Sequence, residues 1–389
     1  MNKGKTLFAQ LMSFVPWYEF DKCVKRYKGD YKVQSFDCRQ QFLVMCFAQL
    51  TGRESLRDIE ACLNAVPEKL YHSGIRQLVK KSTLADANET RNWKIFADFA
   101  QVLIPVARKL YQNENDFTVE LDNIAYALDS TSIELCLSIF PWAKFRENKG
   151  AVKAHTLLDL RGSIPTFIKL TDGLSHDVNV LDDIDFEAGA FYIMDKGYTD
   201  FKRFHRINKC GAFFVTRAKS NLQFERLESR KVTKTFGIIC DQTIRLRGFY
   251  PSKDYPDTLR RIKYYDKETG KTFVFITNNF RISAKNVTKY YKERWRIELF
   301  FKWIKQNLRI KVFYGTTRNA VYLQIWVAVC VYLLLAIIKA QMRIKIGLHT
   351  MSQVFEFCIF EKMLINQLFE EKKLNKIISN FPNQLILFE

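Results

Sequence analysis

The sequence predicts an α/β protein in which a mixed sheet core with a β-rich insertion lies between a helical N-terminal region and C-terminal helices. Three observations lead to this prediction. Helical periodicity runs through the first 120 residues, short apolar strands with one intervening helix follow residue 121, and a helical pattern returns from about residue 283.

The charge balance points to a polyanionic partner. Lys and Arg number 61 against 41 Asp and Glu, which gives the 389 residues a formal net charge of +20. Such an excess favours nucleic acid as the partner, with an anionic membrane next and a merely soluble basic protein as the alternative. Hydrophobic residues make up 48% of the chain, enough for a packed core rather than wholesale disorder.

The cysteines indicate a reducing compartment. All nine are scattered singly, without a CxxC pair, and several lie in apolar runs such as the one around Cys46. Such residues are typical of buried thiols in a cytoplasmic protein. With only five histidines and none at ligand spacing from a cysteine, no zinc site is expected.

In the N-terminal region, a break separates two helical patterns. Residues 42–47 continue a helix that starts at Phe36, the segment 51–53 interrupts it, and Ser55 can cap a second helix through Leu63. This order is typical of a helix-turn-helix, but an ordinary helical hairpin explains it equally well.

One apolar run, at 325–338, could suggest a membrane span. Its 14 residues are fewer than the roughly 20 that cross a bilayer, and Gln324 and Lys339 bracket it. The run therefore predicts a core helix that is covered on all sides.

The middle of the chain reads as three strands, a fourth strand, a helix and a fifth strand. The strands are expected at 124–128, 152–160, 164–170, 191–194 and 212–216, and the helix begins near Phe201 and ends at Gly211. From 219 to 282, short β-like runs at 237–240, 243–246 and 272–276 are separated by turn sequences. This stretch predicts a β-rich insertion.

The first and fourth of these strands are each expected to end at an aspartate, Asp129 and Asp195. Ligands of open α/β sheets bind at the carboxyl ends of the strands. A helix expected at 285–308 adds a polar stripe, with an apolar face opposite. The stripe consists of Tyr291, Arg294, Glu298, Lys302 and Lys305, and Glu293 points off it.

A single carboxylate among cations and an aromatic ring suits a metal ligand beside phosphate-binding groups. Hard cations such as Mg²⁺ prefer carboxylate oxygens, and two such ions can serve both ends of an in-line displacement at phosphorus. We therefore expect Asp129, Asp195 and Glu298 to converge as catalytic carboxylates and metal ligands.

Three motifs carry a resemblance to a known family. The segment from Tyr291 to Lys305 resembles the Y-x2-R-x3-E-x6-K signature of the insertion sequence 4 family of DDE transposases. Residues 128–131 are similar to its first aspartate motif, residues 194–198 to its second, with Lys196 where Arg is frequent, and residues 214–217 to the strand that follows.

The resemblance spans roughly residues 120–340 and implies an RNase H-like catalytic core at 121–218 and 283–340 with an insertion at 219–282. Outside it, we expect a helical DNA-binding region at 1–120 and a helical region at 341–389. The resemblance also implies Mg²⁺ as two ions, with Mn²⁺ as a substitute, and cut-and-paste transposition at terminal inverted repeats. The expected partners are double-stranded transposon ends and target DNA and a second copy of the chain in a synaptic dimer, with no membrane, in a bacterial-type cytoplasm near the nucleoid.

The matching Tyr291, Arg294 and Lys305 are expected to hold DNA, as are Trp295 and Lys302. The family carries a Trp in its insertion that takes up a flipped base, whereas this chain has no Trp from 144 to 294. Phe249, Tyr250 or another aromatic residue could substitute, or the hairpin step could differ, and the role stays unassigned.

Further candidates lie beside the strands. Lys153 alternates with His155 and could reach phosphate, although a filler role is as plausible, and Arg217 is a second DNA-contact candidate. His176 and Asp177 follow a turn and are expected to cap it. The acidic cluster at 182–185 is interpreted as solvated.

Two other functions compete with a transposase. One is a non-catalytic DNA-binding protein derived from a decayed transposase, and the other is a nuclease with the same core that acts on RNA or junctions. The intact set of three carboxylates argues against the first, and the stripe of Tyr, Arg, Glu and Lys argues against the second.

Overall fold

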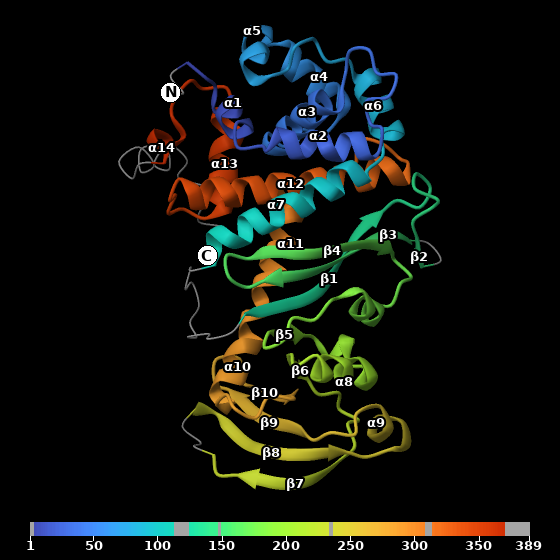
Figure 1. The fold of residues 1–389 in the computed structure, drawn as a ribbon, viewed down its shortest axis with the longest axis vertical. Coiled ribbons are helices and arrows are strands. Elements are labelled where there is room, and N and C mark those ends of the chain that lie inside the picture. The colour runs from blue at the N-terminus through green and yellow to red at the C-terminus, as the bar shows by residue number, and fades with distance from the viewer. Residues whose placement is uncertain (1–3, 113–123, 147–148, 233–235, 308–312, 370–389) are drawn as a thin grey trace. The chain divides into compact units, whose positions relative to one another are not determined.

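The computed structural model describes residues 4–112, 124–146, 149–232, 236–307 and 313–369, which fall into two compact units (Figure 1). The helical unit comprises residues 1–111 and 302–389, and the sheet unit comprises residues 112–301. The four regions expected from the sequence remain a prediction. The compact units combine the N-terminal region with the C-terminal helices, and the sheet core with the insertion.

Helices build the described part of the helical unit. They are α1 (Leu7–Met12), α2 (Trp17–Arg26), α3 (Cys38–Leu50), α4 (Leu56–Asn64), α5 (Pro67–Leu70), the 3-10 helix η1 (Tyr71–Ser73), α6 (Lys81–Thr90), α7 (Lys94–Tyr111), α12 (Arg318–Gln341), α13 (Leu348–Cys358) and α14 (Ile365–Leu368). The predicted helical N-terminal region is thus confirmed as far as Tyr111, and residues 113–120 lie outside the described residues.

The two helices expected around the break at 51–53 are present as α3 and α4. Ser55 caps α4 as predicted, because its side chain accepts a hydrogen bond from the amide of Asp58 at 3.1 Å. On α4, Arg57 and Ala61 are exposed whereas Ile59 and Leu63 are buried. The choice between a helix-turn-helix and a helical hairpin remains open.

Helix α12 is the core helix predicted from the apolar run at 325–338. It is long and apolar enough to cross a membrane, and its apolar window is 100% buried inside the protein. It packs against α3, α6, α7 and α13 of the same unit. Burial on all sides explains why the helix lacks a polar face.

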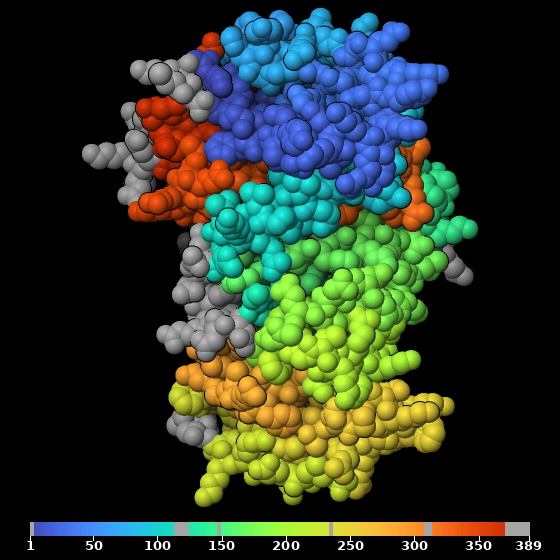
Figure 2. Space-filling view, in the orientation of Figure 1, coloured from blue at the N-terminus to red at the C-terminus, as the bar shows by residue number. Residues whose placement is uncertain are grey.

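The beginning and the end of the described chain lie side by side in the helical unit. The amides of Leu7 and Phe8 donate to the carbonyls of Glu361 and Ile359, each at 2.9 Å, and Gln10 Nε2 donates to the carbonyl of Met363 at 2.6 Å. Figure 2 shows the blue N-terminal atoms next to the orange and red C-terminal ones. This pairing ties the N-terminal region to the C-terminal helices.

In the part of the sheet unit that the structure describes, ten strands form one mixed sheet. Its order is β2-β3-β1-β5-β6-β10-β9-β8-β7, and β4 also pairs with β3. The core strands are β1 (Ala125–Leu135), β2 (Lys144–Arg146), β3 (Lys149–Asp159), β4 (Ile164–Asp172), β5 (Phe191–Met194) and β6 (Phe213–Arg217). β1, β3 and β4 are antiparallel, and β1, β5 and β6 are parallel. The predicted RNase H-like mixed sheet is confirmed.

The insertion extends this same sheet instead of forming a separate layer. Its strands are β7 (Phe224–Arg230), β8 (Ile238–Leu246), β9 (Leu259–Asp266) and β10 (Lys271–Thr277), and β10 pairs with β6. The two short runs expected at 237–240 and 243–246 are one strand, β8, with a register shift. Both β7 and the helix α9 (Phe249–Asp254) were missed because their residues are mostly exposed and lack an apolar pattern.

The predicted end of the first strand at Asp129 was wrong. β1 continues to Leu135 because β3 goes on pairing with it, from Ser130 opposite His155 to Leu135 opposite Gly150. The parallel pairing with β5 does end there, since Leu128 opposite Met194 is its last pair. Asp129 therefore lies where one of its two neighbouring strands stops.

The sheet unit also contains α8 (Phe201–Lys209), α10 (Ala284–Glu293), the first turns of α11 (Trp295–Asn307) and the 3-10 helices η2 (Asp177–Asp183) and η3 (Lys196–Tyr198). A single helix had been predicted from 285 to 308. The structure divides it at Arg294, where Arg294 and Ile297 both bond to the third residue before them. Such a tightened turn inside a helix often marks a functional position.

The two faces of the sheet differ at β5. Phe191 stacks on Tyr290 of α10, with ring centroids 4.7 Å apart. Tyr192 and Met194 lie in the opposite core, together with Val180 of η2 and Phe204 of α8. Because side chains alternate along a strand, Asp129 belongs to the α10 face and Ser130 to the η2 face.

Candidate acid site

Asp129 and Asp195 lie next to each other because their strands are in register. Leu128 pairs with Met194 in the parallel ladder of β1 and β5, and each aspartate is the next residue of its strand. Asp195 directly follows β5 and is half-buried, as is Asp129. Two carboxylates therefore lie at the sheet edge where the parallel pairing of β1 and β5 ends.

Arg294 joins Asp129 to Glu298. Its Nη1 lies 2.7 Å from Asp129 Oδ2, and its Nη2 bonds to Glu298 one turn further along α11. The guanidinium is only 15% exposed. Charge-assisted bonds from one planar fork to two carboxylates fix the relative positions of all three groups.

Asp195 is held by a second arginine and a tyrosine. Arg217, the last residue of β6, donates to Asp195 Oδ1 from Nη2 at 2.5 Å and from Nε at 3.1 Å. Tyr291 Oη donates to the same oxygen at 3.1 Å. The ring of Tyr291 has the guanidinium groups of Arg217 and Arg294 each 5.8 Å from its centroid, so it links the two halves of the site.

The two aspartates have opposite pKa shifts. Burial raises the pKa of Asp129 to about 6, and the charges of Asp195 and Glu298 add to this, against the attraction of Arg294. Burial also raises the pKa of Asp195, but hydrogen bonds, above all from Arg217, bring it below the ordinary value. Neighbouring groups thus give two similar carboxylates different affinities for a proton.

The residue types of the acid site (Asp129, Asp195 and Glu298) suit a hard divalent cation, because all three supply oxygen ligands. Among the residues that the structure describes, no group of three or more His, Cys, Asp or Glu surrounds one common point that a metal ion could occupy. Between Asp129 and Glu298 stands the guanidinium of Arg294. The three carboxylates are suitable ligands for a metal ion. In this structure, Arg294 forms ion pairs with two of them, Asp129 and Glu298.

Three further predicted DNA contacts lie on α11. Trp295 opens the helix and is 59% exposed. Lys302 and Lys305 follow Glu298 by one and two turns, and both belong to the helical unit. The predicted apolar face of this helix is confirmed by the burial of Ile297, Phe300, Phe301 and Ile304, and Leu308 lies outside the described residues. Glu293, which was expected to point off the polar stripe, accepts a hydrogen bond at its Oε2 from Arg296 Nε at 2.6 Å.

Lys153 and Asp177 form an arrangement that the sequence did not reveal. Asp177 was expected to cap a turn, which was wrong, because its Oδ1 accepts hydrogen bonds from Ser130 Oγ at 2.9 Å and Lys153 Nζ at 3.2 Å. His176 occupies the cap position of η2 without a side-chain capping bond. The sequence signal was the alternation of Lys153 and His155 on β3, which does not identify their partners.

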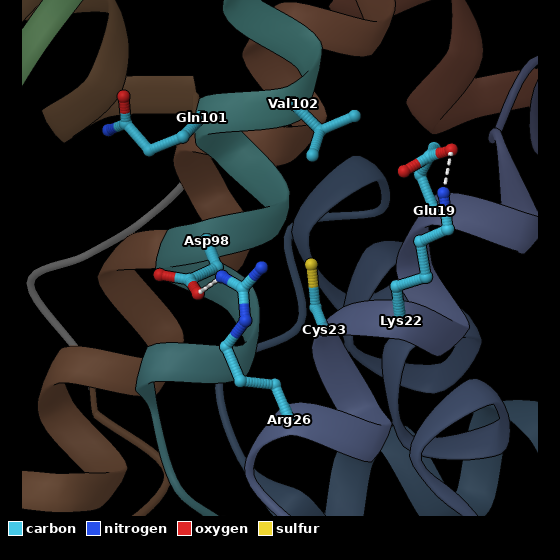
Figure 3. A pocket seen from close by; sticks show the side chains of 7 residues that line it. All are labelled: Glu19, Lys22, Cys23, Arg26, Asp98, Gln101 and Val102. Carbon is cyan, nitrogen blue, oxygen red and sulfur yellow. Dashed lines mark hydrogen bonds and ion pairs between the residues drawn. The ribbon is translucent and has the colours of Figure 1, made fainter.

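Other surface features do not involve the acid site. A pocket of about 390 Å³ lies between α2 and α7, with Arg26 bound to Asp98 at its wall and the buried Cys23 at its side (Figure 3). In the insertion, Phe249 and Tyr250 of α9 are 75% and 73% exposed, with ring centroids 5.2 Å apart. These two are the exposed aromatic pair that the sequence offered in place of a Trp.

Fold and site together define an α/β protein with an acid site at the carboxyl ends of the central strands of an RNase H-like sheet. The family described as transposase DDE domain matches residues 121–334, and a domain of unknown function matches residues 3–76. The chain belongs to the DDE transposases. It is therefore a DNA-binding and DNA-cleaving protein of a class that generally uses divalent metal ions.

Relatives agree with this family. A protein of Sinorhizobium fredii named as the transposase y4zB is 34% identical over 283 residues, which cover 72% of this chain and 77% of the relative. A Geobacillus stearothermophilus protein named as the transposase for insertion sequence element IS5377 is 30% identical over 54% of this chain and 55% of its own length. A solved piggyBac transposase synaptic complex with hairpin DNA aligns at a TM-score of 0.45 with 12% identity, over 97% of this chain and 84% of that one.

Proposed function

We propose that this protein moves an insertion sequence by cut-and-paste transposition. It cleaves phosphodiester bonds at the terminal inverted repeats and joins the freed 3′ ends to target DNA. The observation that carries the proposal is the bridging of Asp129 and Glu298 by Arg294, beside an Asp195 that Arg217 and Tyr291 hold. Three carboxylates and two arginines at one strand edge suit phosphoryl chemistry better than a structural ion pair.

Asp129, Asp195 and Glu298 are the residues that would hold Mg²⁺, or Mn²⁺ in its place. When bound, two such ions activate a water or 3′-hydroxyl and stabilise the departing oxygen. Below about pH 6 Asp129 must also lose a proton before it can hold a cation, because its pKa is raised to about 6. Glu298 and Asp129 must also release Arg294, whose five donors then become available.

The arginines are proposed to exchange carboxylate partners for phosphate. The planar fork of Arg294 or Arg217 matches two phosphate oxygens as well as two carboxylate oxygens. The ring of Tyr291 lies 5.8 Å from each of the two guanidinium groups. Trp295 is a further proposed DNA contact of the sheet unit, and Lys302 and Lys305 are proposed DNA contacts of the helical unit. This exchange would couple loading of the acid site to arrival of DNA.

We further propose that a synaptic dimer brings two transposon ends together, in the cytoplasm. The helical N-terminal region would bind the inverted repeats, since it carries many of the exposed cations of the chain. The net charge of +20 supports affinity for double-stranded DNA of any sequence.

The test uses purified full-length protein and a labelled duplex that carries the element's own end. We expect Mg²⁺-dependent cleavage at the element boundary, and we expect Glu298→Gln to bind this duplex with wild-type affinity but to leave it intact. The matched control is Glu293→Gln, which changes the last residue of α10, a carboxylate that binds Arg296, and this variant should still cleave. Full cleavage by Glu298→Gln would refute the site, and specific binding by the wild type without cleavage in Mg²⁺ or Mn²⁺ would favour a non-catalytic DNA-binding protein.

A further inference from the structure

Behind the acid site, on the η2 face of the sheet, lies a second polar cluster that the proposed chemistry does not use. We name it the Asp177 network, and it consists of Ser130, Lys153 and Asp177. Ser130 directly follows Asp129 on β1, Lys153 lies on the neighbouring β3, and Asp177 is the first residue of η2. The network therefore touches the backbone of one predicted catalytic residue from the opposite face.

The network lies where β1 lacks a neighbour. Beyond Leu128 the pairing with β5 ends, so β3 alone holds the β1 backbone from Asp129 onward. A strand segment bonded on one side has more freedom than one bonded on both. The position of the Asp129 carboxylate thus depends on whatever else restrains this segment.

Asp177 supplies such a restraint. The same oxygen, Oδ1, accepts from Ser130 Oγ at 2.9 Å and from Lys153 Nζ at 3.2 Å. Lys153 Nζ also donates to the carbonyl of Ser175 at 2.9 Å, which fixes the segment leading into η2. A charged, half-buried acceptor shared by two strands ties β1 to β3 through side chains where the β5 ladder is missing.

The network also adjoins the turn of the second aspartate. Tyr198 of η3 is 2% exposed, and its backbone amide donates to the carbonyl of Asp195 at 3.0 Å. Its hydroxyl is close enough to Asp129 and Asp177 for their charges to raise its pKa, in addition to burial. His155, 1% exposed, approaches the shared oxygen of Asp177 to 3.8 Å from β3. Tyr198 and His155 are thus both close to Asp177, and Tyr198 is also bonded to the Asp195 turn.

We propose that Asp177 is a positioning residue, which acts through Ser130 to hold the carboxylate of Asp129 at the distance from Asp195 that a divalent cation requires. The inference rests on the proposed function, because it takes the acid site to be the metal site. Lys153, a DNA-contact candidate by sequence, in this view holds Asp177 instead.

The test compares Asp177→Asn and Ser130→Ala with a matched control, Asp183→Asn. Asp183 lies in the same η2 and also pairs with a lysine of the neighbouring strand, Lys169, at 2.7 Å, but on the exposed surface. Mn²⁺ affinity is measured from the electron paramagnetic resonance signal of the free ion. The Mg²⁺ dependence of cleavage and the thermal midpoint of unfolding are measured on the same variants. Removing a partner that orients a metal ligand typically costs about 10- to 100-fold in affinity or activity.

We expect Asp177→Asn and Ser130→Ala to weaken Mn²⁺ binding by at least about tenfold, and to raise the Mg²⁺ requirement of cleavage in parallel. Asp183→Asn should bind Mn²⁺ as the wild type does, and Ser130→Thr, which keeps the hydroxyl, should restore affinity. Should Asp177→Asn fail to fold, Ser130→Ala tests the same link with a smaller change.

Unchanged Mn²⁺ affinity in both variants, with only a lower thermal midpoint, would reduce the network to a structural brace and overturn the inference alone. A wild type that neither binds Mn²⁺ nor cleaves the duplex would instead contradict the proposed function, and this inference with it.

Discussion

Asp129 and Asp195 lie at the same register position of adjacent parallel strands, each one residue beyond the last pair, yet their surroundings differ. Asp129 shares Arg294 with Glu298, and burial raises its pKa to about 6. Asp195 accepts hydrogen bonds from Arg217 and Tyr291, and its pKa is lowered. The same strand-end position can therefore yield one carboxylate with a raised pKa and another with a lowered pKa. The neighbours on β6, α10 and α11 decide which.

The largest effect is expected from removing either charge. Asp129→Asn and Asp195→Asn should each lower the cleavage rate by about 10³-fold or more. The proposed catalytic carboxylates act together, so the loss of one removes most of the activity. The two variants should differ in stability. Asp195→Asn leaves Arg217 without its carboxylate and should cost about 1–3 kcal/mol, whereas Asp129→Asn removes a buried charge and should cost less.

Cleavage rates of the two variants in Mg²⁺ and their thermal midpoints without metal check this prediction. Equal loss of stability in both would show that the environments of the two aspartates are alike and would break the comparison.

The next effect concerns Arg294. Arg294→Ala should bind Mn²⁺ about 10-fold more tightly than the wild type, because a cation no longer competes for Asp129 and Glu298. It should also weaken binding to the transposon end. The slope of log affinity against log salt concentration should fall by about 1, the value for one phosphate contact. Arg296→Ala, which removes the same charge from the Glu293 pair on the same helix, is the control.

Titration of the free Mn²⁺ ion and binding isotherms at several salt concentrations measure both quantities. If Mn²⁺ affinity falls in Arg294→Ala, the arginine helps to form the ion site rather than to fill it. An unchanged salt slope would remove Arg294 from the DNA contacts.

The smallest effect is the pH dependence. Since the pKa of Asp129 is raised to about 6, its contribution to folding stability is fully present below its ordinary pKa of about 3.9 and is lost as pH rises through 6. Asp195 behaves in the opposite sense, because a lowered pKa gives stability above the ordinary value that is lost in more acidic solution.

Because a cation binds only the ionised carboxylate, Mn²⁺ affinity should decline by up to about tenfold per pH unit below 6. Mn²⁺ titrations from pH 5 to pH 7, about the ordinary working range, measure this decline. A profile that is flat across this range would place the pKa of Asp129 near that of an ordinary carboxyl group.

Much of the fold could be predicted from the chain. The strands at 191–194 and 212–216 and the core helix around 325–338 were read correctly, because a buried element shows its period or its unbroken apolar run. The edge strand β7 was not, since its residues are nearly all exposed and charged ones dominate. The break at Arg294 was missed because the residue's tertiary partners, two carboxylates, lie 165 residues upstream and four downstream.

The residues proposed for the site could be selected from the sequence, but their hydrogen-bond partners could not. Strand ends and a polar helix stripe pointed to Asp129, Asp195 and Glu298 without any knowledge of pairing. Which cation binds which carboxylate depends on the approach of β6 and α10, which periodicity does not reveal. Asp177 was interpreted as a cap for the same reason. Its partners Ser130 and Lys153 are distant in the sequence, whereas the turn before it is local.

The most direct test of the acid site replaces Mg²⁺ with Fe²⁺ and lets the bound ion generate hydroxyl radicals in the presence of ascorbate and peroxide. These radicals cut the backbone only close to the ion. The account predicts cuts beside Asp129, Asp195 and Glu298 together, all suppressed by excess Mg²⁺ and all absent in Asp195→Ala. Cuts that cluster elsewhere in the chain, or cuts at these three positions that persist in Asp195→Ala, would contradict the assignment of these carboxylates as one metal site.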